Sequence, residues 1–351
     1  MSDNNNIVTI KDIAQKANVS IGTVDRVLHN RGRVAAETSR IIKKIIQELG
    51  YKPNIFASRL SRSKTFNFAV LMPEFKQDSK YWQTSALGIQ RAERELARYH
   101  VKIKYFYYDR YSVKQFHETT GKVLDSNVDG ILIVPLLKNA VKEFITRLPD
   151  SIPYVFFNTL VEDMKPLAFI GQDSFKSGTV CGKLMKMIIH EPGTVAVILT
   201  MQNDLHILNR AQGFSSLFND DSDIKIREYE IFNFKNSNIT SNLISLIFTE
   251  NPDLRGIFVT NVSAHYLAEY IETNVKDRKI FLIGYDLIEK NIHYLKKGTI
   301  DFLINQKPEQ QGYEGIYTLY RSVVLHEMCE REKVMPIDII TSENVDYYSN
   351  Y

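Results

Sequence analysis

From residue 66 onward, short apolar runs alternate with longer amphipathic stretches. An apolar run, a helical pattern and a further apolar run are typical of strand–helix–strand units, whose parallel strands are covered by helices on both faces. The pattern runs through two series, the second beginning near Leu167. We therefore predict an α/β body of two doubly wound parallel-sheet lobes. The predicted strands are 67–72, 101–107, 130–135, 153–158, 195–200, 256–260 and 279–284.

The boundaries of the two lobes follow from the same alternation. The last segment, from about His326 to Tyr351, is charged and then apolar, and we expect it to cross back and finish the second lobe with a strand. The body, 65–351, then consists of a first lobe, about 65–160 and 290–325, and a second lobe, about 161–289 and 326–351. The predicted helices are 82–99, 113–126, 138–148, 175–190, 207–218, 239–250 and 264–273.

The length and composition are those of a multidomain globular protein. The chain has 351 residues, and no apolar run approaches the roughly 20 residues that span a bilayer. The first residues, MSDNNN, lack the features of a secretory signal. Cys181 and Cys329 lie far apart and lack partner motifs. We therefore expect a cytoplasmic protein.

Catalytic and metal-binding motifs are missing from the sequence. There is no GxSxG elbow, no Walker A loop and no GxGxxG after a strand. The eight histidines are scattered, and the two cysteines lack CxxC spacing. We expect no enzyme, no metal site and no cofactor, although an enzyme with the two-lobe fold remains an alternative.

The first 64 residues carry an excess of positive charge. They hold twelve basic and five acidic side chains, a net charge of +7, whereas residues 65–351 have a net charge of −4. A compact basic end joined to a mildly acidic body indicates a polyanion-binding surface. Charge alone does not separate this interpretation from an ordinary solvated basic surface.

Apolar residues recur at helical spacing in three stretches of this basic end. Thr9 with Asp12 suits a capping box for the first stretch, Ser20 is a good N-cap for the second, and Gly50 is a stop signal for the third. Two short helices braced by a third form a helix-turn-helix pattern, although patterning alone also allows any three-helix bundle. The expected buried positions are Ile10, Ile13, Ala14, Ala17, Val24, Val27, Leu28, Ile41, Ile42, Ile45, Ile46 and Leu49.

Two sequence motifs make this pattern specific. The run VTIKDIAQKANVSIGTVDRVL, residues 8–28, is followed by ELGYKPN, residues 48–54. Together they closely resemble the N-terminus of the LacI/GalR repressor family, because the turn, the Val-Ser cap, the Thr-Val-x-Arg-Val core and the Gly-Tyr-x-Pro-Asn exit occur in order. The resemblance implies a helix-turn-helix DNA-binding domain over residues 1–50.

The resemblance also implies roles for individual residues of the second helix. Arg26 can bond bidentately to guanine, and Ile21 can contact a thymine methyl group. Gly22 has no side chain, so one of the side chains that usually contact base edges in the family is missing. Asp25 departs from the small hydroxyl residue that is usual in the family. The resemblance places Ile21, Gly22 and Arg26 toward base edges and Ser20 and Thr23 toward phosphates.

A short basic segment, NIFASRLSRSK, leads to the body. In the family the corresponding segment, here within 51–64, is a hinge helix that orders on operator DNA and pairs with its twin in a second subunit. By position, Leu60 is the wedge in the minor groove, Ala57 lies at the contact between hinge helices, and Asn54 is a further DNA-binding residue. The alternative is a flexible linker in which Leu60 caps the next domain.

The resemblance continues through the body, to the type I periplasmic sugar-binding proteins that supply the family's effector domain. The matching pieces are YWQTSALGIQRAEREL, VDGILIVPL, IPYVFFNT, FIGQDSFKSG, NRAQGF, IFVTN, FLIGYD and GTIDFLINQKPEQQGY. Val262 replaces an acidic residue that is usual after the asparagine of IFVTN. The resemblance places seven residues toward the cleft between the lobes: Tyr81, Trp82, Asn158, Arg210, Asn261, Asp286 and Gln306.

These residue types suit a sugar. Aromatic rings such as Tyr81 and Trp82 can stack on a sugar ring, and Arg210 and Asp286 can bond to hydroxyl groups. The three amides can act as combined donors and acceptors. Asp173 is a weaker candidate for the same rim. Structural alternatives remain: Asp286 and Asn261 as helix caps, and Tyr81 as partly buried packing.

The expected function is a DNA-binding transcription regulator, with repression as the usual outcome in the family. We expect a homodimer that reads a palindromic operator and binds a small carbohydrate effector between its lobes. Effector and DNA affinities would then be coupled reciprocally. A solute-binding protein of a transport system, without DNA binding, is the alternative class.

Overall fold

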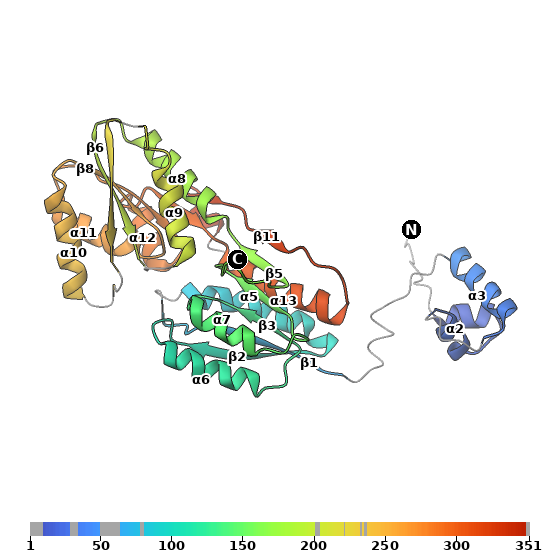
Figure 1. Ribbon diagram of the computed structural model, residues 1–351. Coiled ribbons are helices and arrows are strands. Elements are labelled where there is room, and N and C mark those ends of the chain that lie inside the picture. The colour runs from blue at the N-terminus through green and yellow to red at the C-terminus, as the bar shows by residue number, and fades with distance from the viewer. Residues whose placement is uncertain are drawn as a thin grey trace. The chain divides into compact units, whose positions relative to one another are not determined.

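The protein forms two compact units, residues 1–63 and 64–351 (Figure 1). The computed structural model describes residues 10–28, 34–49, 64–77, 81–200, 204–220, 222–231, 234 and 237–348.

Three helices make up the described part of the first unit: α1 (Ile10–Lys16), α2 (Ile21–Leu28) and α3 (Ala36–Glu48). Their core includes Ile13, Val24 and Ile42, one from each helix and all fully buried. As predicted, Ser20 caps α2, because its Oγ accepts a hydrogen bond from the Thr23 amide at 3.2 Å. The three predicted helices are therefore confirmed.

One predicted core position of α3 is wrong. Ile41 is 45% exposed, whereas its neighbour Ile42 is fully buried. Successive helical residues are turned by about 100°, so α3 can present only one stripe to α1 and α2. That stripe contains Ile42 and Ile45, with Ile46 and Leu49 packed beside them. Ile41 lies to one side of it.

The second unit contains two six-stranded sheets, with strand orders β11-β5-β4-β3-β1-β2 and β12-β10-β9-β8-β6-β7. All pairings are parallel except β10 with β12. The first sheet consists of β1 (Phe66–Pro73), β2 (Val101–Tyr108), β3 (Gly130–Ile133), β4 (Tyr154–Phe157), β5 (Ala168–Gly171) and β11 (Glu332–Val334). The second consists of β6 (Gly193–Leu199), β7 (Ile224–Glu230), β8 (Leu254–Val259), β9 (Phe281–Tyr285), β10 (Phe302–Asn305) and β12 (Asp338–Ile340).

Helices cover both faces of each sheet, which defines two lobes. In lobe 1, α5 (Tyr81–Leu96) and α13 (Pro308–Leu319) cover one face, and α6 (Val113–Leu124) and α7 (Lys138–Arg147) cover the other. Neighbouring strand residues divide between the faces, so Val70 packs under α5 and α13 while Leu71 packs under α6 and α7. In lobe 2 the corresponding pairs are α8 (Ser174–Ile188) with α9 (Leu205–Ser215), and α10 (Ser237–Glu250) and α11 (Ala264–Asn274) with α12 (Glu289–Lys296). The doubly wound α/β body is confirmed.

The chain passes between the lobes three times: after β5, after β10 and after β11. Gln172, on the first crossing, holds the three segments together. Its Nε2 donates to the carbonyl oxygens of Asn305 at 3.3 Å and Pro336 at 2.9 Å, which lie on the second and third crossings. The three crossings therefore form one hydrogen-bonded hinge.

The crossings do not fall where the sequence analysis divided the lobes. Strand β5 pairs with β4 in lobe 1, although 161–289 was assigned to lobe 2. Helix α12 and strand β10 belong to lobe 2, although 290–325 was assigned to lobe 1. The C-terminal segment adds β11 to lobe 1 before it adds β12 to lobe 2. A strand pattern specifies burial but not the sheet in which a strand pairs.

Candidate DNA-binding helix and interlobe cleft

Helix α2 separates its buried and exposed residues cleanly. Val24 and Val27 are buried, whereas Ile21 is 49% exposed and Gly22 and Arg26 are also exposed. All three residues that were expected to face base edges therefore lie on the open surface of the helix. Asn54, Ala57 and Leu60, the expected hinge contacts, lie outside the described residues.

The two expected phosphate contacts bond to each other in this structure. The Ser20 and Thr23 hydroxyl oxygens are 2.9 Å apart. At Gly22 a Cβ atom would come no closer than 3.8 Å to its nearest neighbour, Ser20 Oγ. Packing therefore does not require glycine at this position. Gly22 leaves the exposed surface of α2 without a side chain there.

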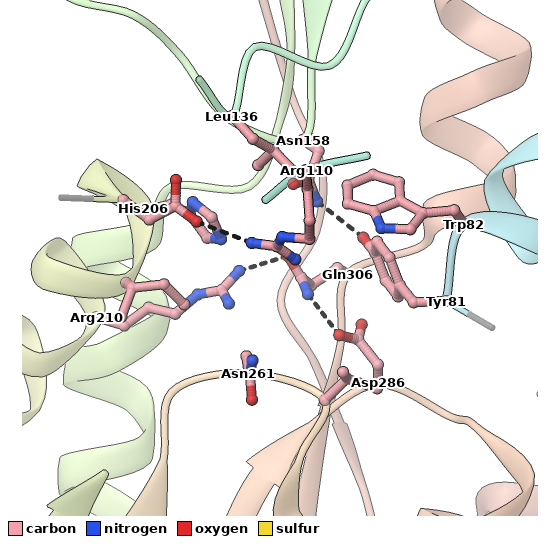
Figure 2. Close-up of a pocket in the computed structure, with 13 residues that line it drawn as sticks. Tyr81, Trp82, Arg110, Leu136, Asn158, His206, Arg210, Asn261, Asp286 and Gln306 are labelled. Carbon is pink, nitrogen blue, oxygen red and sulfur yellow. Dashed lines mark hydrogen bonds and ion pairs between the residues drawn. The ribbon is translucent and has the colours of Figure 1, made fainter. Parts of the chain in front are cut away.

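The second candidate site lies between the lobes, where all seven predicted cleft residues line one pocket (Figure 2). Tyr81 and Trp82 begin α5, and Asn158 follows β4, all in lobe 1. The other four come from lobe 2 and from the crossing after β10: Arg210 on α9, Asn261 after β8, Asp286 after β9 and Gln306 after β10. The strand ends thus meet at the cleft, as parallel sheets require.

Asn158 and Asp286 occupy matching places in the two lobes. Each directly follows a strand end, with φ angles of 71° and 70°. Asn and Asp tolerate this left-handed conformation better than most residues. The Asn158 Nδ2 donates to the Tyr81 hydroxyl at 2.8 Å, and the Asp286 Oδ2 accepts from Gln306 Nε2 at 2.7 Å. Both strand ends therefore hold a neighbouring cleft side chain in place.

Arg210 is the central cation of the site and is only 1% exposed. It donates to the Thr260 carbonyl oxygen at 2.8 Å and to the Gln306 Oε1. Its guanidinium also lies 4.0 Å from the centre of the Tyr285 ring. Gln306 accepts from Arg210 and donates to Asp286, so one amide links the buried cation to the buried carboxylate.

Glycines position the helix that carries Arg210. A Cβ atom at Gly178 of α8 would lie 2.0 Å from the Arg210 carbonyl oxygen, and one at Gly213 of α9 would lie 2.0 Å from the Phe175 carbonyl oxygen. Backbone therefore packs directly on backbone where α8 crosses α9. This close contact sets how far Arg210 reaches into the cleft.

A charged pair that was not predicted from the sequence joins the lobes. Arg110, just after β2, donates from Nη2 to Asp204 Oδ2 at 3.2 Å, and both residues are 6% exposed. Arg110 is itself held by Gln77, whose Oε1 accepts from the Arg110 amide at 3.1 Å. The signal available in the sequence was a run of polar residues directly after a strand.

His206, which follows Asp204 near the start of α9, was also missed. Burial lowers the pKa of His206 well below its usual value, and the nearby charges of Arg210 and Arg110 lower it further. The imidazole is therefore neutral at physiological pH. Its Nδ1 is buried and has no hydrogen-bond partner among the described residues.

Of the two residues for which helix capping was an alternative, neither is an N-cap residue in this structure. Asp286 does not cap a helix, because α12 begins at Glu289 and its N-cap residue is Ile288. Asn261 braces the turn before α11, since its Oδ1 accepts from the Ser263 amide at 2.9 Å, and it also lines the cleft. Asp173 is not part of the cleft lining; it caps α8 by accepting from the Lys176 amide at 2.9 Å.

The cleft is nearly closed in this structure. The residues that line it enclose about 30 Å³, whereas pockets for small organic ligands usually measure about 300–1,000 Å³. The space therefore suits a water molecule, and a larger ligand requires the lobes or the side chains to move apart.

Within the described residues, no three His, Cys, Asp or Glu side chains gather as a possible metal site. In the same part of the chain, no helix has both the length and the apolar character needed to cross a bilayer.

The comparisons with known proteins agree with both units. Residues 9–54 match the model for bacterial regulatory proteins of the lacI family, and residues 68–324 match the periplasmic binding protein domain. The chain belongs to the periplasmic binding protein domain family, whose model covers most of its body. Its LacI-type helix-turn-helix and its two-lobed binding domain follow one another in a single chain, as the sequence resemblance predicted.

Individual relatives are similar to parts of the chain. The catabolite control protein A of Staphylococcus aureus is 31% identical over 157 residues, which is 44% of this chain and 45% of that protein. A Bacteroides fragilis protein described as a candidate LacI transcriptional regulator has 28% identity and a TM-score of 0.75, covering 81% of this chain and all of that one. GanP, a glucose-galactose binding protein of Geobacillus stearothermophilus, shares the fold, with 21% identity, a TM-score of 0.71 and coverage of 81% and 99%. The first of these matches spans less than half of the relative's length.

Proposed function

We propose that this protein is a sequence-specific DNA-binding transcription regulator that acts as a repressor. We further propose that a sugar or sugar derivative, bound between the lobes, controls its affinity for operator DNA. The observation that carries the proposal is the presence, in one chain, of a LacI-type helix with an exposed reading face and a polar, aromatic cleft between two lobes.

The proposed DNA contacts use the exposed face of α2. Arg26 would bond to a guanine and Ile21 would touch a thymine methyl group in the major groove, while Ser20 and Thr23 would turn their hydroxyls to phosphates. In the hinge segment, Leu60 is proposed to wedge into the minor groove, Ala57 to lie at the contact between the two hinge helices, and Asn54 to contact the DNA. The half-sites would form a palindrome read by a homodimer, because a two-fold protein matches a two-fold operator.

The proposed effector is an uncharged carbohydrate. Tyr81 and Trp82 supply aromatic surface, with their ring centres 4.9 Å apart and the rings nearly perpendicular. Arg110 pairs with Asp204, Arg210 is linked to Asp286 through Gln306, and His206 is neutral. The buried charges therefore balance, and an additional carboxylate or phosphate would be uncompensated. The name of the structural relative GanP, a glucose-galactose binding protein, supports the same class of ligand.

Coupling between the two sites follows from the lobes. An effector that prefers one arrangement of the lobes shifts the protein toward that arrangement. The effector would then change the affinity for DNA by the same factor by which DNA changes the affinity for the effector. The protein would act in the cytoplasm, where its operator is, and the proposal assigns it no catalytic step.

Operator binding tests the proposal. Sites selected from a random DNA pool should contain palindromes that the full-length protein binds specifically, with affinity falling steeply as salt rises. Arg26→Ala should weaken binding to the selected site by roughly 5- to 150-fold, corresponding to about 1–3 kcal/mol. Lys44, exposed on α3, offers the control substitution Lys44→Ala. Sequence-independent binding would refute the proposal, and absence of DNA binding would favour a solute-binding protein.

A further inference from the structure

A second cavity adjoins the central cleft. It encloses about 380 Å³ between α5 and α13 of lobe 1 and the segment after β9 in lobe 2. Tyr81 and Asp286 line both spaces, so these two side chains form the partition between them. Figure 2 shows Tyr81 and Asp286 on the same side of the cleft, across from His206 and Arg210. The side cavity therefore opens from one end of the site.

The two spaces differ strongly in size. The central cleft encloses about 30 Å³ in this structure, and the side cavity alone lies within the usual range for ligand pockets, about 300–1,000 Å³. A ligand held by the central residues can extend in the direction of the side cavity. The shape of the combined site is thus elongated.

The side cavity has the chemistry of a carbohydrate site. Tyr81 and Tyr348 supply ring surface, and Thr84, Asn305 and Gln310 supply hydroxyl and amide groups for hydrogen bonds. This combination suits a ring with apolar C–H faces and several hydroxyl groups.

The charged residues of the side cavity have partners within the protein. Arg91 pairs with Glu309 at 3.5 Å, Lys307 with Asp338 at 2.9 Å, and Glu314 with Lys333 at 2.7 Å. A bound ion would have to compete with these partners, whereas an uncharged hydroxylated ring can bond to the same groups without displacing them.

We propose that the effector contains more than one sugar ring, with one ring in the central cleft and the next in the side cavity. The proposal rests on the proposed function, in which the cleft binds a carbohydrate. The partition residues, Tyr81 and Asp286, would then contact both rings.

Calorimetric titration of the full-length protein tests this inference. The ligands are glucose, galactose, mannose and xylose, together with disaccharides built from them. At least one disaccharide should bind roughly tenfold more tightly than either of its monosaccharides, because the second ring buries additional surface without a second loss of translational freedom. A monosaccharide that binds as tightly as its disaccharides overturns the inference and leaves the proposed function intact.

Two variants locate the second ring. Thr84 lines the side cavity but not the central cleft, so Thr84→Trp should remove the advantage of the disaccharide and preserve monosaccharide affinity. Gln83, exposed on the same helix and outside both linings, gives the control Gln83→Trp, which should keep the advantage. An advantage that survives Thr84→Trp overturns the side-cavity assignment. If none of these sugars binds, both this inference and the carbohydrate part of the proposed function fail.

Discussion

The Arg110–Asp204 pair gives a direct test of how the lobes close. Arg110 belongs to lobe 1 and Asp204 to lobe 2, and both side chains are 7% exposed. At 3.2 Å and an effective dielectric constant of about 20, the attraction of the two charges is about 5 kcal/mol. Desolvation of the two ions offsets much of this attraction. We therefore expect a net coupling of about 1–2 kcal/mol in favour of the closed lobes.

Removing either partner should weaken effector binding. Arg110→Ala or Asp204→Ala destabilises the closed arrangement, so the effector has to close a more open protein. A loss of about 1–2 kcal/mol corresponds to a roughly 5- to 30-fold weaker affinity. The measurement is calorimetric titration of both single variants and the double variant, and the double variant should bind only slightly more weakly than either single one.

The double-mutant cycle also supplies the refutation. If the two single effects add to within about 0.5 kcal/mol in the double variant, the residues are not coupled and the interlobe pair does not govern closure. Lys296→Ala is the control, because Lys296 pairs with Asp346 at 2.6 Å on the exposed surface of lobe 2. Such exposed pairs contribute little, so this variant should bind the effector as the wild type does.

Three further predictions concern packing, pH and DNA. Gly178→Ala should destabilise the protein by about 1–3 kcal/mol and weaken effector binding, because the new methyl group pushes Arg210 away; Gly121→Ala, where a Cβ meets nothing within 4 Å, should be neutral or stabilising in the same thermal and calorimetric assays. Burial lowers the pKa of His265 from 6.5 to about 4, so the unfolded chain binds the proton first and stability falls as pH drops below about 6.5. The contribution of His265 to this loss should reach about 2 kcal/mol at pH 5, so the loss should be smaller by that amount in His265→Gln, and equal urea-unfolding losses in both proteins would contradict it. Asp25→Ser should tighten operator binding in a titration at matched salt, because an acidic side chain on the DNA-facing helix repels phosphates; unchanged or weaker affinity would show that Asp25 does not face DNA.

The sequence was sufficient to predict those elements that are determined by the pattern of neighbouring residues. The alternation of apolar runs predicted seven of the twelve described strands, β1–β4, β6, β8 and β9, with small errors at their ends, and Ser20 signalled the start of α2. A final strand in the last segment was also expected, whereas β5, β7, β10 and β11 were not predicted. Strand β7 was missed because charged residues alternate along it, Lys225, Arg227 and Glu228 among them, as they do on an exposed edge strand. The resemblance to a family brought seven cleft residues together that spacing alone would not have assembled.

Contacts between residues far apart in the sequence could not be predicted from local pattern. Arg110 and Asp204 are 94 positions apart, and nothing near either residue indicates its partner. The assignment of β5 and β10 to their sheets also depends on pairing between distant segments. Ile41 was placed in the core because five apolar residues of α3 looked like one face, although a helix packed on two small neighbours buries a narrower stripe.

The two C-terminal strands have a consequence for synthesis. Strands β11 and β12 are the outer strands beside β5 and β10, so neither lobe is complete before the last part of the chain leaves the ribosome. Until then the edges of β5 and β10 lack these partners and are open to strand addition by other chains. Helices α1, α2 and α3 are made before the body and can fold before it, because domains generally fold in the order of their synthesis. A chain terminated shortly after α13 would therefore carry the DNA-binding helices on a body with two incomplete sheets, prone to aggregation.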